Sequence, residues 1–381
     1  MFVLYFSIVI LVVCAYCYLI IYILNQWAAI ESIPDNTKDG DPSLSGVSII
    51  IPARNEAENI ISCLKSILSN DAVENIKPQI IVVDDHSIDN TAQLVIDVES
   101  PYVQLLSLNI DGNNSNPINA YKKAAISLGL SQCKYDYVIQ FDADTIVPKE
   151  YLKTIIKYKN ENKAEFLAAP IKCYPCDNLL HHFQQLDILG MMAVTGAGIQ
   201  SSKWYMANGA NMSYRKNNVQ FSPQDLASGD DVYTIQKVAE EKPESILYIK
   251  DAKAVVTTAP VNSYGDLYQQ RIRWATKNKM MPNLMMQMMM GIPFINALMM
   301  IAHIPMMIVF GIPAILLFSF HLMIKLMIDY IFLKEITTHF DAHESMRYFL
   351  PANLMHIVYI ACIGALSFFI KDYKWKGRTV H

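Results

Sequence analysis

The sequence of 381 residues has little charge and few cysteines. Charged side chains make up 17% of it, whereas a typical soluble domain carries about 25%. The 35 Asp and Glu residues outnumber the 31 Lys and Arg residues, so there is no basic excess to neutralise nucleic-acid phosphates. Seven scattered cysteines are too few for a disulfide framework. We therefore expect no nucleic-acid partner and no small disulfide-bonded fold.

Hydrophobic residues instead make up 52% of the sequence. Such a composition excludes an intrinsically disordered protein. Residues 1–24 contain no charged side chain, and about 20 apolar residues are enough to span a bilayer. A secretory signal peptide would need a basic start and a shorter apolar core. We therefore predict an N-terminal transmembrane anchor over 1–24.

A second apolar region follows residue 279. Residues 291–333 hold only Lys325 and Asp329 as formal charges, and residues 349–370 hold none. At about 20 residues per span, we predict about three hydrophobic membrane segments within 280–370. Lys325 and Asp329 are four residues apart, so on a helix they share a face and can form an ion pair.

The basic tail over 371–381 leaves the orientation of these segments open. Basic segments prefer the cytoplasmic side of a membrane. A cytoplasmic domain followed by three spans would place this tail outside. Either one C-terminal segment lies in the membrane interface or the rule fails here. The Met- and Leu-rich run Met280–Met290 is the candidate interfacial helix.

Between the apolar ends, residues 45–279 have the composition of a globular domain. The runs Val47–Pro52, Gln79–Val83 and Tyr137–Phe141 are apolar and of the length of buried parallel strands. Helical segments alternate with them. This alternation predicts an α/β fold with a mostly parallel sheet.

Acidic pairs follow two of these runs. Asp84 and Asp85 end the second run, and Asp142 and Asp144 follow the third. Ligands of open α/β sheets bind at the carboxyl ends of the strands. Paired carboxylates suit Mg²⁺ or Mn²⁺, particularly when phosphates complete the coordination shell. A solvated turn is the alternative for one such pair, but two pairs at strand ends favour a metal and phosphate site.

Two further motifs lie later in the domain. Asp230 and Asp231 precede a helical stretch, where one Asp commonly caps the helix and the other can serve as a general base. Gln270, Arg273 and Trp274 share one face of a helix and suit a phosphate and a sugar ring. A basic, aromatic interfacial helix is the alternative for the second motif.

In order along the chain, these motifs resemble those of the membrane-bound branch of the family 2 glycosyltransferases. That branch includes cellulose, hyaluronan and poly-N-acetylglucosamine synthases and ceramide glucosyltransferases. The resemblance covers residues 47–274 and the flanking apolar segments. The matching segments are Ile51-Pro-Ala-Arg-Asn-Glu56, Asp84-Asp-His-Ser-Ile-Asp-Asn-Thr91, Asp142-Ala-Asp144, Gly229-Asp-Asp231 and Gln270-Arg-Ile-Arg-Trp274.

The resemblance implies a GT-A (nucleotide-diphospho-sugar transferase) fold and an inverting transfer from a nucleotide-diphosphate sugar, most often a UDP-sugar. It also implies roles for single residues. The residues that the resemblance implies bind the base and ribose of the nucleotide are Pro52, Glu56, Asp84 and Asp85. Asp142 would contact the nucleotide, and Asp144, with Asp142, would hold Mg²⁺ or Mn²⁺ on the diphosphate.

For the acceptor, the resemblance implies that Asp231 is the base, with Asp230 beside it in the substrate site. The residues that the resemblance implies bind the diphosphate and the acceptor end are Gln270, Arg273 and Trp274. Lys122 and the segment Asn208–Asn211 also match positions near the site in relatives. Thr257-Thr258 departs from the pattern, because relatives often carry Glu there.

The acceptor does not follow from these motifs. Four spans would make a thin channel for a polymer, so we favour transfer to a membrane-associated lipid, with a processive polysaccharide synthase as the alternative. A catalytically inactive membrane scaffold would be expected to lose a metal or base carboxylate, and none is missing. We expect an integral protein of a bacterial inner membrane, in contact with its lipids, with a cytoplasmic catalytic domain.

Overall fold

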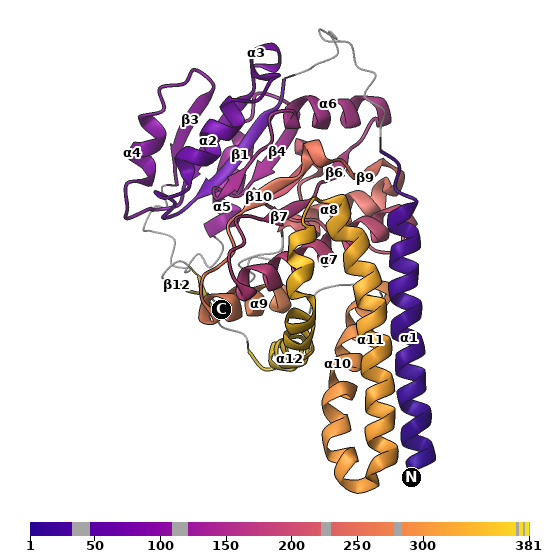
Figure 1. The fold of residues 1–381 in the computed structure, drawn as a ribbon. Helices are drawn as coiled ribbons and strands as arrows, with labels where there is room; N and C mark the ends of the chain where they lie inside the picture. The colour runs from indigo at the N-terminus through magenta and orange to yellow at the C-terminus, as the bar shows by residue number, and fades with distance from the viewer. Residues whose placement is uncertain are drawn as a thin grey trace. The chain divides into compact units, whose positions relative to one another are not determined.

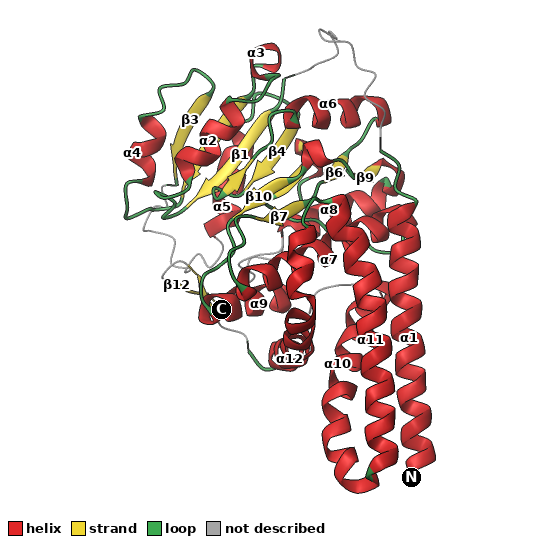
Figure 2. Cartoon of the chain, in the orientation of Figure 1, coloured by secondary structure: helices red, strands yellow, loops and turns green. Residues whose placement is uncertain are grey.

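The computed structural model describes residues 1–32, 46–108, 121–221, 230–277, 284–370, 373–375 and 378–380. The chain forms two compact units. The helical unit comprises residues 1–29, 173–204 and 260–373, and the α/β unit comprises residues 30–172, 205–259 and 374–381. Figure 1 follows the chain by residue number, and Figure 2 distinguishes its helices from its strands.

A seven-stranded sheet forms the centre of the α/β unit, in the order β3-β2-β1-β4-β8-β6-β9. Its strands are β1 (Ser48–Ala53), β2 (Gln79–Asp84), β3 (Val103–Ser107), β4 (Tyr137–Phe141), β6 (Phe166–Ala168), β8 (Asn211–Arg215) and β9 (Ile246–Tyr248). β1 pairs in parallel with β2 and β4, and β2 pairs in parallel with β3. β8 runs antiparallel to β4 and β6. The predicted α/β fold with a mostly parallel sheet is confirmed.

The helices of the α/β unit are α2 (Ile60–Leu68), α3 (Val73–Ile76), α4 (Thr91–Ile96), α5 (Tyr121–Ser131), α6 (Tyr151–Asn162) and α8 (Asp230–Glu241). Short 3₁₀ turns are η1 (Lys216–Asn218), η2 (Pro243–Ser245) and η3 (Ala252–Ala254). Successive strand residues point to opposite faces of a sheet, yet Ile49, Ile50 and Ile51 of β1 are all fully buried. Both faces are therefore covered. A Cβ at Gly129 of α5 would lie 2.9 Å from Ile50 Cγ2, so glycine permits this close approach.

A small second sheet has the order β5-β10-β7. Its strands are β5 (Thr145–Ile146), β10 (Val256–Thr258) and β7 (Ile171–Cys173). β10 pairs antiparallel with β5, with Thr258 opposite Thr145. Because β5 directly follows Asp144, this pairing brings Thr258 to the acidic turn after β4. A further pair, β11 (Tyr373–Trp375) and β12 (Arg378–Val380), lies in the predicted basic tail, whose other residues are outside the described residues.

The helical unit contains α1 (Phe2–Ala28), α7 (Leu179–Ser201), α9 (Tyr264–Lys277), α10 (Leu284–Phe310), α11 (Ile312–His339), η5 (His343–Tyr348) and α12 (Phe349–Ser367). Among the described residues, four helical segments are long and apolar enough to cross a membrane. They are Phe2–Ala28, Leu284–Phe310, Ile312–His339 and His343–Ser367. One lies at the start of the chain and three lie in its C-terminal part.

The predicted interfacial helix over Met280–Met290 is not a separate helix in the described chain. Leu284–Met290 form the first turns of α10, and residues 280–283 lie outside the described residues. Met, Leu and Gln are good helix formers, so nothing in this run stops the helix before the following apolar residues. α10 ends instead at Gly311, whose φ of +60° suits glycine and allows the tight turn into α11.

The predicted ion pair of α11 is confirmed. Lys325 Nζ lies 2.5 Å from Asp329 Oδ2, and both side chains are buried. Tyr16 of α1 donates a hydrogen bond to Asp329 Oδ1 (2.6 Å), and Asn353 of α12 bonds both members of the pair. These polar side chains therefore connect three of the four apolar helical segments.

The sequence places α7 and α9 in one domain over 45–279, whereas in the structure both helices belong to the helical unit. α7 runs without interruption to Ser201. Most of α7 is buried, including Gln184 and Gln185. A helix buried on all sides does not show the apolar stripe by which surface helices are predicted.

Candidate active site

Two loops at the carboxyl ends of β1 and β2 are joined by hydrogen bonds between side chains and backbone. The amide of Asn55 donates to Ser87 Oγ (2.9 Å), and the amide of Ile88 donates to Asn55 Oδ1 (2.9 Å). The amide of Glu56 donates to Thr91 Oγ1 (2.8 Å). Each loop therefore satisfies the polar groups of the other, which holds both at one edge of the sheet.

Charged side chains add to this contact between the loops. Arg54 Nη1 donates to the carbonyl oxygens of Asp85 (2.7 Å) and His86 (2.9 Å). Asp89 accepts hydrogen bonds from the Thr91 hydroxyl and amide and from the Ala57 amide. Desolvation acts to raise the pKa of Asp89, but these hydrogen bonds outweigh it, so the pKa lies below its ordinary value. These hydrogen bonds from Thr91 and Ala57 therefore stabilise the carboxylate form of Asp89.

The residues predicted for the base and ribose lie on this pair of loops. Pro52 is paired with Val83 across β1 and β2, and Glu56 accepts a hydrogen bond from Asn59 Nδ2 (2.9 Å). Asp84 and Asp85 are both buried. The structure thus brings Pro52, Glu56, Asp84 and Asp85 to the same edge of the sheet, but their contact with a nucleotide stays a prediction.

The carboxylates of Asp84 and Asp85 differ in their partners. Asp85 Oδ1 lies 3.0 Å from His86 Nδ1. Asp84 Oδ2 accepts a hydrogen bond from the Ser87 amide (3.3 Å), while its buried Oδ1 has no hydrogen-bond partner among the described residues. A buried acceptor without a partner is costly. A ribose hydroxyl or a base N–H would satisfy it.

The two carboxylates after β4 also have separate partners. Lys122 Nζ of α5 lies 2.5 Å from Asp142 Oδ1. Thr258 Oγ1 of β10 donates a hydrogen bond to Asp144 Oδ2 (2.9 Å). The Asp142 carbonyl accepts hydrogen bonds from the Thr145 amide (3.3 Å) and hydroxyl (2.8 Å), which fixes the turn. Asp142 therefore has a cation beside it, whereas Asp144 is oriented by a hydroxyl.

Cys63 of α2 lies beneath this turn, with its Sγ 3.9 Å from the Asp142 carbonyl oxygen. Burial, with smaller contributions from the nearby Asp144 and Glu56 carboxylates, raises its pKa to about 12. The thiol is therefore neutral at physiological pH and does not compete as a nucleophile.

Asp231 is brought to the same site through Gly209. The Gly209 amide donates a hydrogen bond to Asp231 Oδ2 (3.3 Å). A Cβ at Gly209 would lie 3.2 Å from Gln140 Nε2, 3.7 Å from Lys122 Nζ and 3.8 Å from Asp231 Oδ2. Asp231 and the Lys122–Asp142 pair therefore gather around one glycine, although 89 positions separate Asp142 from Asp231 in the sequence.

Asp230 and Asp231 form the first turn of α8, and Gly229 of the same motif lies outside the described residues. Asp231 Oδ1 accepts a hydrogen bond from the Val232 amide (2.9 Å). Asp230 is buried, and Asp231 is more exposed. This difference favours Asp231 as the carboxylate that meets an acceptor, and its role as base stays a prediction.

The segment Asn208–Asn211, predicted to lie on the acceptor side, divides into two parts. Gly209 approaches Asp231, as described above. Asn211, in contrast, is fully buried, and its Nδ2 donates to the carbonyls of Pro170 (2.7 Å) and Ala254 (2.9 Å). Tyr151 donates to Asn211 Oδ1 (2.6 Å). Asn211 therefore ties strands and loops together through a fully buried side chain.

Gln270, Arg273 and Trp274 lie on α9 of the helical unit and are partly exposed. The buried Oε1 of Gln270 has no hydrogen-bond partner among the described residues. A hydroxyl or amide of a ligand would satisfy it. Because α9 belongs to the other unit, the binding of the diphosphate and acceptor by these three residues stays a prediction.

In the described part of the chain, no group of three or more His, Cys, Asp and Glu side chains is placed to hold a metal ion. Mg²⁺ bound to a nucleotide needs only one or two protein carboxylates, because phosphates and water complete its shell. Asp144 and Asp142, two carboxylates at one turn, fit that requirement.

These features define a GT-A-like α/β domain attached to apolar helices, and comparison with known proteins agrees. Residues 48–227 match the family model described as Glycosyl transferase family 2. This segment of the chain is a family 2 glycosyltransferase domain.

Two curated relatives are poly-beta-1,6-N-acetyl-D-glucosamine synthases. That of Staphylococcus epidermidis (strain RP62A) is 29% identical over 111 residues, which is 29% of this chain and 24% of that protein. That of Staphylococcus aureus (strain COL) is 32% identical over 107 residues, which is 28% of this chain and 24% of that protein. The match thus spans about a quarter of the length of these relatives.

Among solved structures, a mannosyltransferase from Pyrobaculum calidifontis in complex with GDP-Man and Mn²⁺ is similar over most of the chain. The TM-score is 0.60, the sequence identity is 17%, and the match covers 93% of this chain and 99% of that one. At this identity the similarity establishes the GT-A-like fold and not the substrate.

Several residues of the site were missed from the sequence. Arg54, Asn55 and Ser87 join the two nucleotide-side loops, and Thr258 orients Asp144. The loop residues stand inside the recognised motifs, so their polar side chains could have been considered. Thr258 was noted only as a departure from the pattern of relatives, and its contact with Asp144 was not predicted because it depends on β10 pairing with β5.

Proposed function

We propose that this protein is a membrane-bound, inverting glycosyltransferase that transfers a sugar from a UDP-sugar to a growing polysaccharide. The observation that carries the proposal is the gathering of the Lys122–Asp142 pair and Asp231 around Gly209. A donor diphosphate and an acceptor hydroxyl must meet at such a point.

The loops after β1 and β2 would hold the base and ribose, with Asp84 Oδ1 accepting a hydrogen bond from the nucleotide. Asp144, with Asp142, would hold Mg²⁺ or Mn²⁺ on the diphosphate. Such an ion stabilises the negative charge of the leaving group. Lys122, beside Asp142, adds a positive charge at the same place, and Thr258 keeps Asp144 turned toward the site.

Asp231 would act as the general base. The acceptor oxygen forms a bond to the anomeric carbon while the bond from that carbon to the diphosphate oxygen breaks. The nucleoside diphosphate leaves with the bonding electrons, and the acceptor proton passes to the Asp231 carboxylate. Attack opposite the leaving group inverts the anomeric configuration. The hydrogen bonds from the Gly209 and Val232 amides orient the carboxylate for this step.

For the acceptor, the comparisons favour the alternative of our sequence analysis over the lipid that we preferred there. Both relatives are named as synthases of a poly-N-acetylglucosamine. We therefore propose UDP-N-acetylglucosamine as donor and a β-linked glycan as acceptor. Single transfer to a lipid remains the second candidate, because the described chain offers only four apolar helical segments to form a polymer channel.

The same four segments support an integral membrane protein. We propose a bacterial inner membrane with the α/β unit on the cytoplasmic side, where nucleotide sugars are made. The polysaccharide product would then leave on the opposite side of the membrane.

The test is a product assay on purified membranes containing the full chain. Membranes would be incubated with radiolabelled UDP-N-acetylglucosamine, UDP-glucose or UDP-galactose and Mg²⁺ or Mn²⁺. We expect label from UDP-N-acetylglucosamine in a precipitable polymer, and we expect EDTA to abolish it. Label in the organic phase would instead support the lipid acceptor. No UDP release from any sugar would contradict the enzyme and support a scaffold.

Single variants test the assigned roles. We expect Asp231→Asn to abolish turnover but to leave UDP binding unchanged, and Asp144→Ala to lose metal-dependent UDP binding as well. Asp136→Asn is the matched control, because Asp136 is an exposed carboxylate paired with Arg215 on the same unit. Normal turnover by Asp231→Asn would remove the base assignment and direct attention to Asp230.

A further inference from the structure

Arg271, inside the segment Gln270–Trp274, is buried, whereas the predicted site residues Gln270, Arg273 and Trp274 are partly exposed. The side chain of Arg271 is only 1% exposed. Its Nη2 lies 2.9 Å from Oδ2 of Asp187 on α7, whose side chain is 8% exposed. The same guanidinium lies over the indole of Trp274, with Cζ 4.1 Å from the ring centroid. Arg271 thus connects a carboxylate on another helix to the last residue of the motif.

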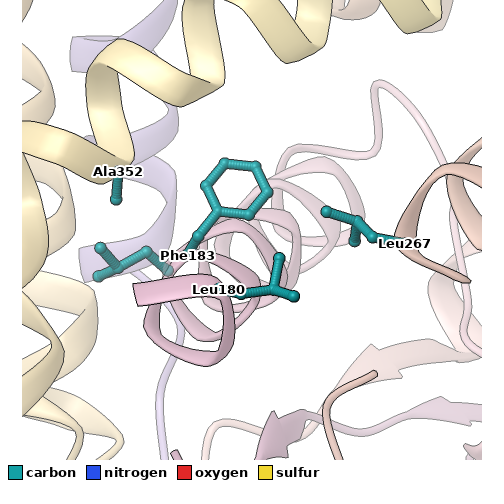
Figure 3. Close-up of a cluster of buried hydrophobic side chains, with 5 residues drawn as sticks. Leu180, Phe183, Leu267 and Ala352 are labelled. Atoms are coloured by element: carbon teal, nitrogen blue, oxygen red, sulfur yellow. The ribbon is translucent and has the colours of Figure 1, made fainter. Parts of the chain in front are cut away.

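An apolar cluster holds the helices that meet at this ion pair. Leu180 and Phe183 of α7 pack with Leu267 of α9 and Ala352 of α12, as Figure 3 shows. Asp187 follows Phe183 by four residues and Arg271 follows Leu267 by four residues, so each charged residue stands one turn beyond the cluster on the same face of its helix. The cluster therefore fixes the distance between the two helices at the ion pair.

The third helix contributes a second contact to Asp187. His356 of α12 follows Ala352 by four residues, and its Nε2 lies 3.8 Å from Asp187 Oδ1. Tyr359, also on α12, presents its ring 6.0 Å from Arg271 Cζ. Arg271 therefore lies against one oxygen of Asp187, and His356 lies near the other.

We propose that Asp187 is a positioning residue for the glycosyl transfer: it fixes Arg271, and through it the indole of Trp274. A guanidinium buried without a counter-ion is strongly unfavourable. Without the Asp187 charge, Arg271 would move toward water and leave the Trp274 ring without its stacking partner. This inference rests on the proposed function, because it takes Trp274 to contact the acceptor end.

The experiment compares Asp187→Asn with Asp329→Asn in the purified full chain. Asp329 is a matched control, because it is also a buried Asp paired with a cation in the helical unit, but its partners are Lys325, Tyr16 and Asn353 and none lies on α9. For Asp187→Asn we expect kcat to fall about tenfold, with the Kd for UDP within about twofold of wild type. For Asp329→Asn we expect a lower Tm and an unchanged kcat.

A double-mutant cycle tests whether Asp187 acts through Arg271. We expect Asp187→Asn to cost little further activity in an Arg271→Met background, because the side chain it positions is already absent. Asp329→Asn should behave the same in both backgrounds. If the fold-loss in kcat of the double variant equals the product of the Asp187→Asn and Arg271→Met fold-losses, the two residues act independently and the proposal is overturned. An equal kcat loss in the Asp329→Asn control would also overturn it.

Tryptophan fluorescence gives a readout that does not need activity. The difference between wild type and Trp274→Phe defines the Trp274 signal. We expect Asp187→Asn to make that signal more accessible to acrylamide, and an unchanged signal would overturn the proposal. If Asp187→Asn does not fold, Arg271→Lys replaces it, since it keeps a cation for Asp187 but loses the planar stacking group and should show the same exposure of Trp274. If the wild-type protein shows no transferase activity but the fluorescence change occurs, the proposed function is contradicted while the contact of Arg271 with Asp187 and Trp274 is supported.

Discussion

Thr258 illustrates, at the scale of a single residue, how the site depends on a contact between positions far apart in sequence. Its hydroxyl donates to Asp144 Oδ2 (2.9 Å), the carboxylate proposed to hold the metal ion. We expect Thr258→Val to raise the Mn²⁺ concentration for half-maximal activity about tenfold, because a hydrogen bond to a charged group contributes about 1.5–3 kcal/mol. A metal titration of the transferase activity measures this.

The control for this prediction is Thr257→Val, the neighbouring threonine on β10. Thr257 pairs with Ile146 and points to the other side of the small sheet. Its substitution should leave the metal requirement unchanged. An equal shift in both variants would mean that β10 itself, and not the Thr258 hydroxyl, is perturbed.

Gly209 is the second residue-scale test, because its amide donates a hydrogen bond to Asp231 and a side chain there would crowd Gln140 beside it. A Cβ there would come within 3.2 Å of Gln140 Nε2, closer than ordinary van der Waals contact. We expect Gly209→Ala to lower kcat at least about tenfold, which is about 1.4 kcal/mol, with a small change in stability. Steady-state kinetics and a thermal melt separate the two effects.

Gly291→Ala is the comparison for Gly209→Ala, because a Cβ at Gly291 of α10 would meet nothing within 4 Å. This control should keep wild-type kinetics. Wild-type kinetics in Gly209→Ala would show that Asp231 is not confined by the glycine and would weaken its assignment as the base.

At the scale of elements, the sequence was informative where local pattern decides structure. β1, β2 and β4 were predicted because uninterrupted apolar runs with β-branched side chains suit a strand buried on both faces. The acidic residues at their ends followed directly from those strand limits. The contact of Gly209 with Asp231 and that of Thr258 with Asp144 could not be predicted, because each depends on the tertiary placement of separate segments.

The ion pair of α11 provides an element-scale prediction about stability. Lys325 and Asp329 are buried and share Asn353 of α12. Removing one partner of a buried pair leaves an uncompensated charge and costs about 3–5 kcal/mol. We expect Lys325→Met to lower the Tm in detergent markedly, with little change in kcat at a temperature where the protein is folded.

The double variant Lys325→Met with Asp329→Leu tests the cause of that loss. Replacing both charges by apolar groups removes the unpaired charge, so most of the lost stability should return. A double variant as unstable as Lys325→Met alone would indicate that the geometry of the pair, together with Tyr16 and Asn353, is what stabilises the bundle.

At the scale of the whole molecule, the chain passes between its two units repeatedly, which the composition does not reveal. Residues 45–279 read as one globular domain, yet 173–204 and 260–279 belong to the helical unit. A charge count cannot show this, because α9 is polar enough to resemble a surface helix. Its attachment follows from Leu267 and Arg271, which are buried against α7 and α12.

This interleaving predicts the behaviour of a fragment. The isolated segment 45–279 would retain α7, with buried side chains such as Phe183, Leu189 and Met192, but would lack α1, α11 and α12. A large exposed apolar patch leads to association. We expect this fragment to aggregate or to require detergent, as measured by size-exclusion chromatography, whereas the chain over 1–370 should give one detergent-solubilised species. A soluble, monomeric fragment with native-like circular dichroism would instead mean that α7 and α9 fold with the α/β unit, and the division of the chain into these two units would have to be redrawn.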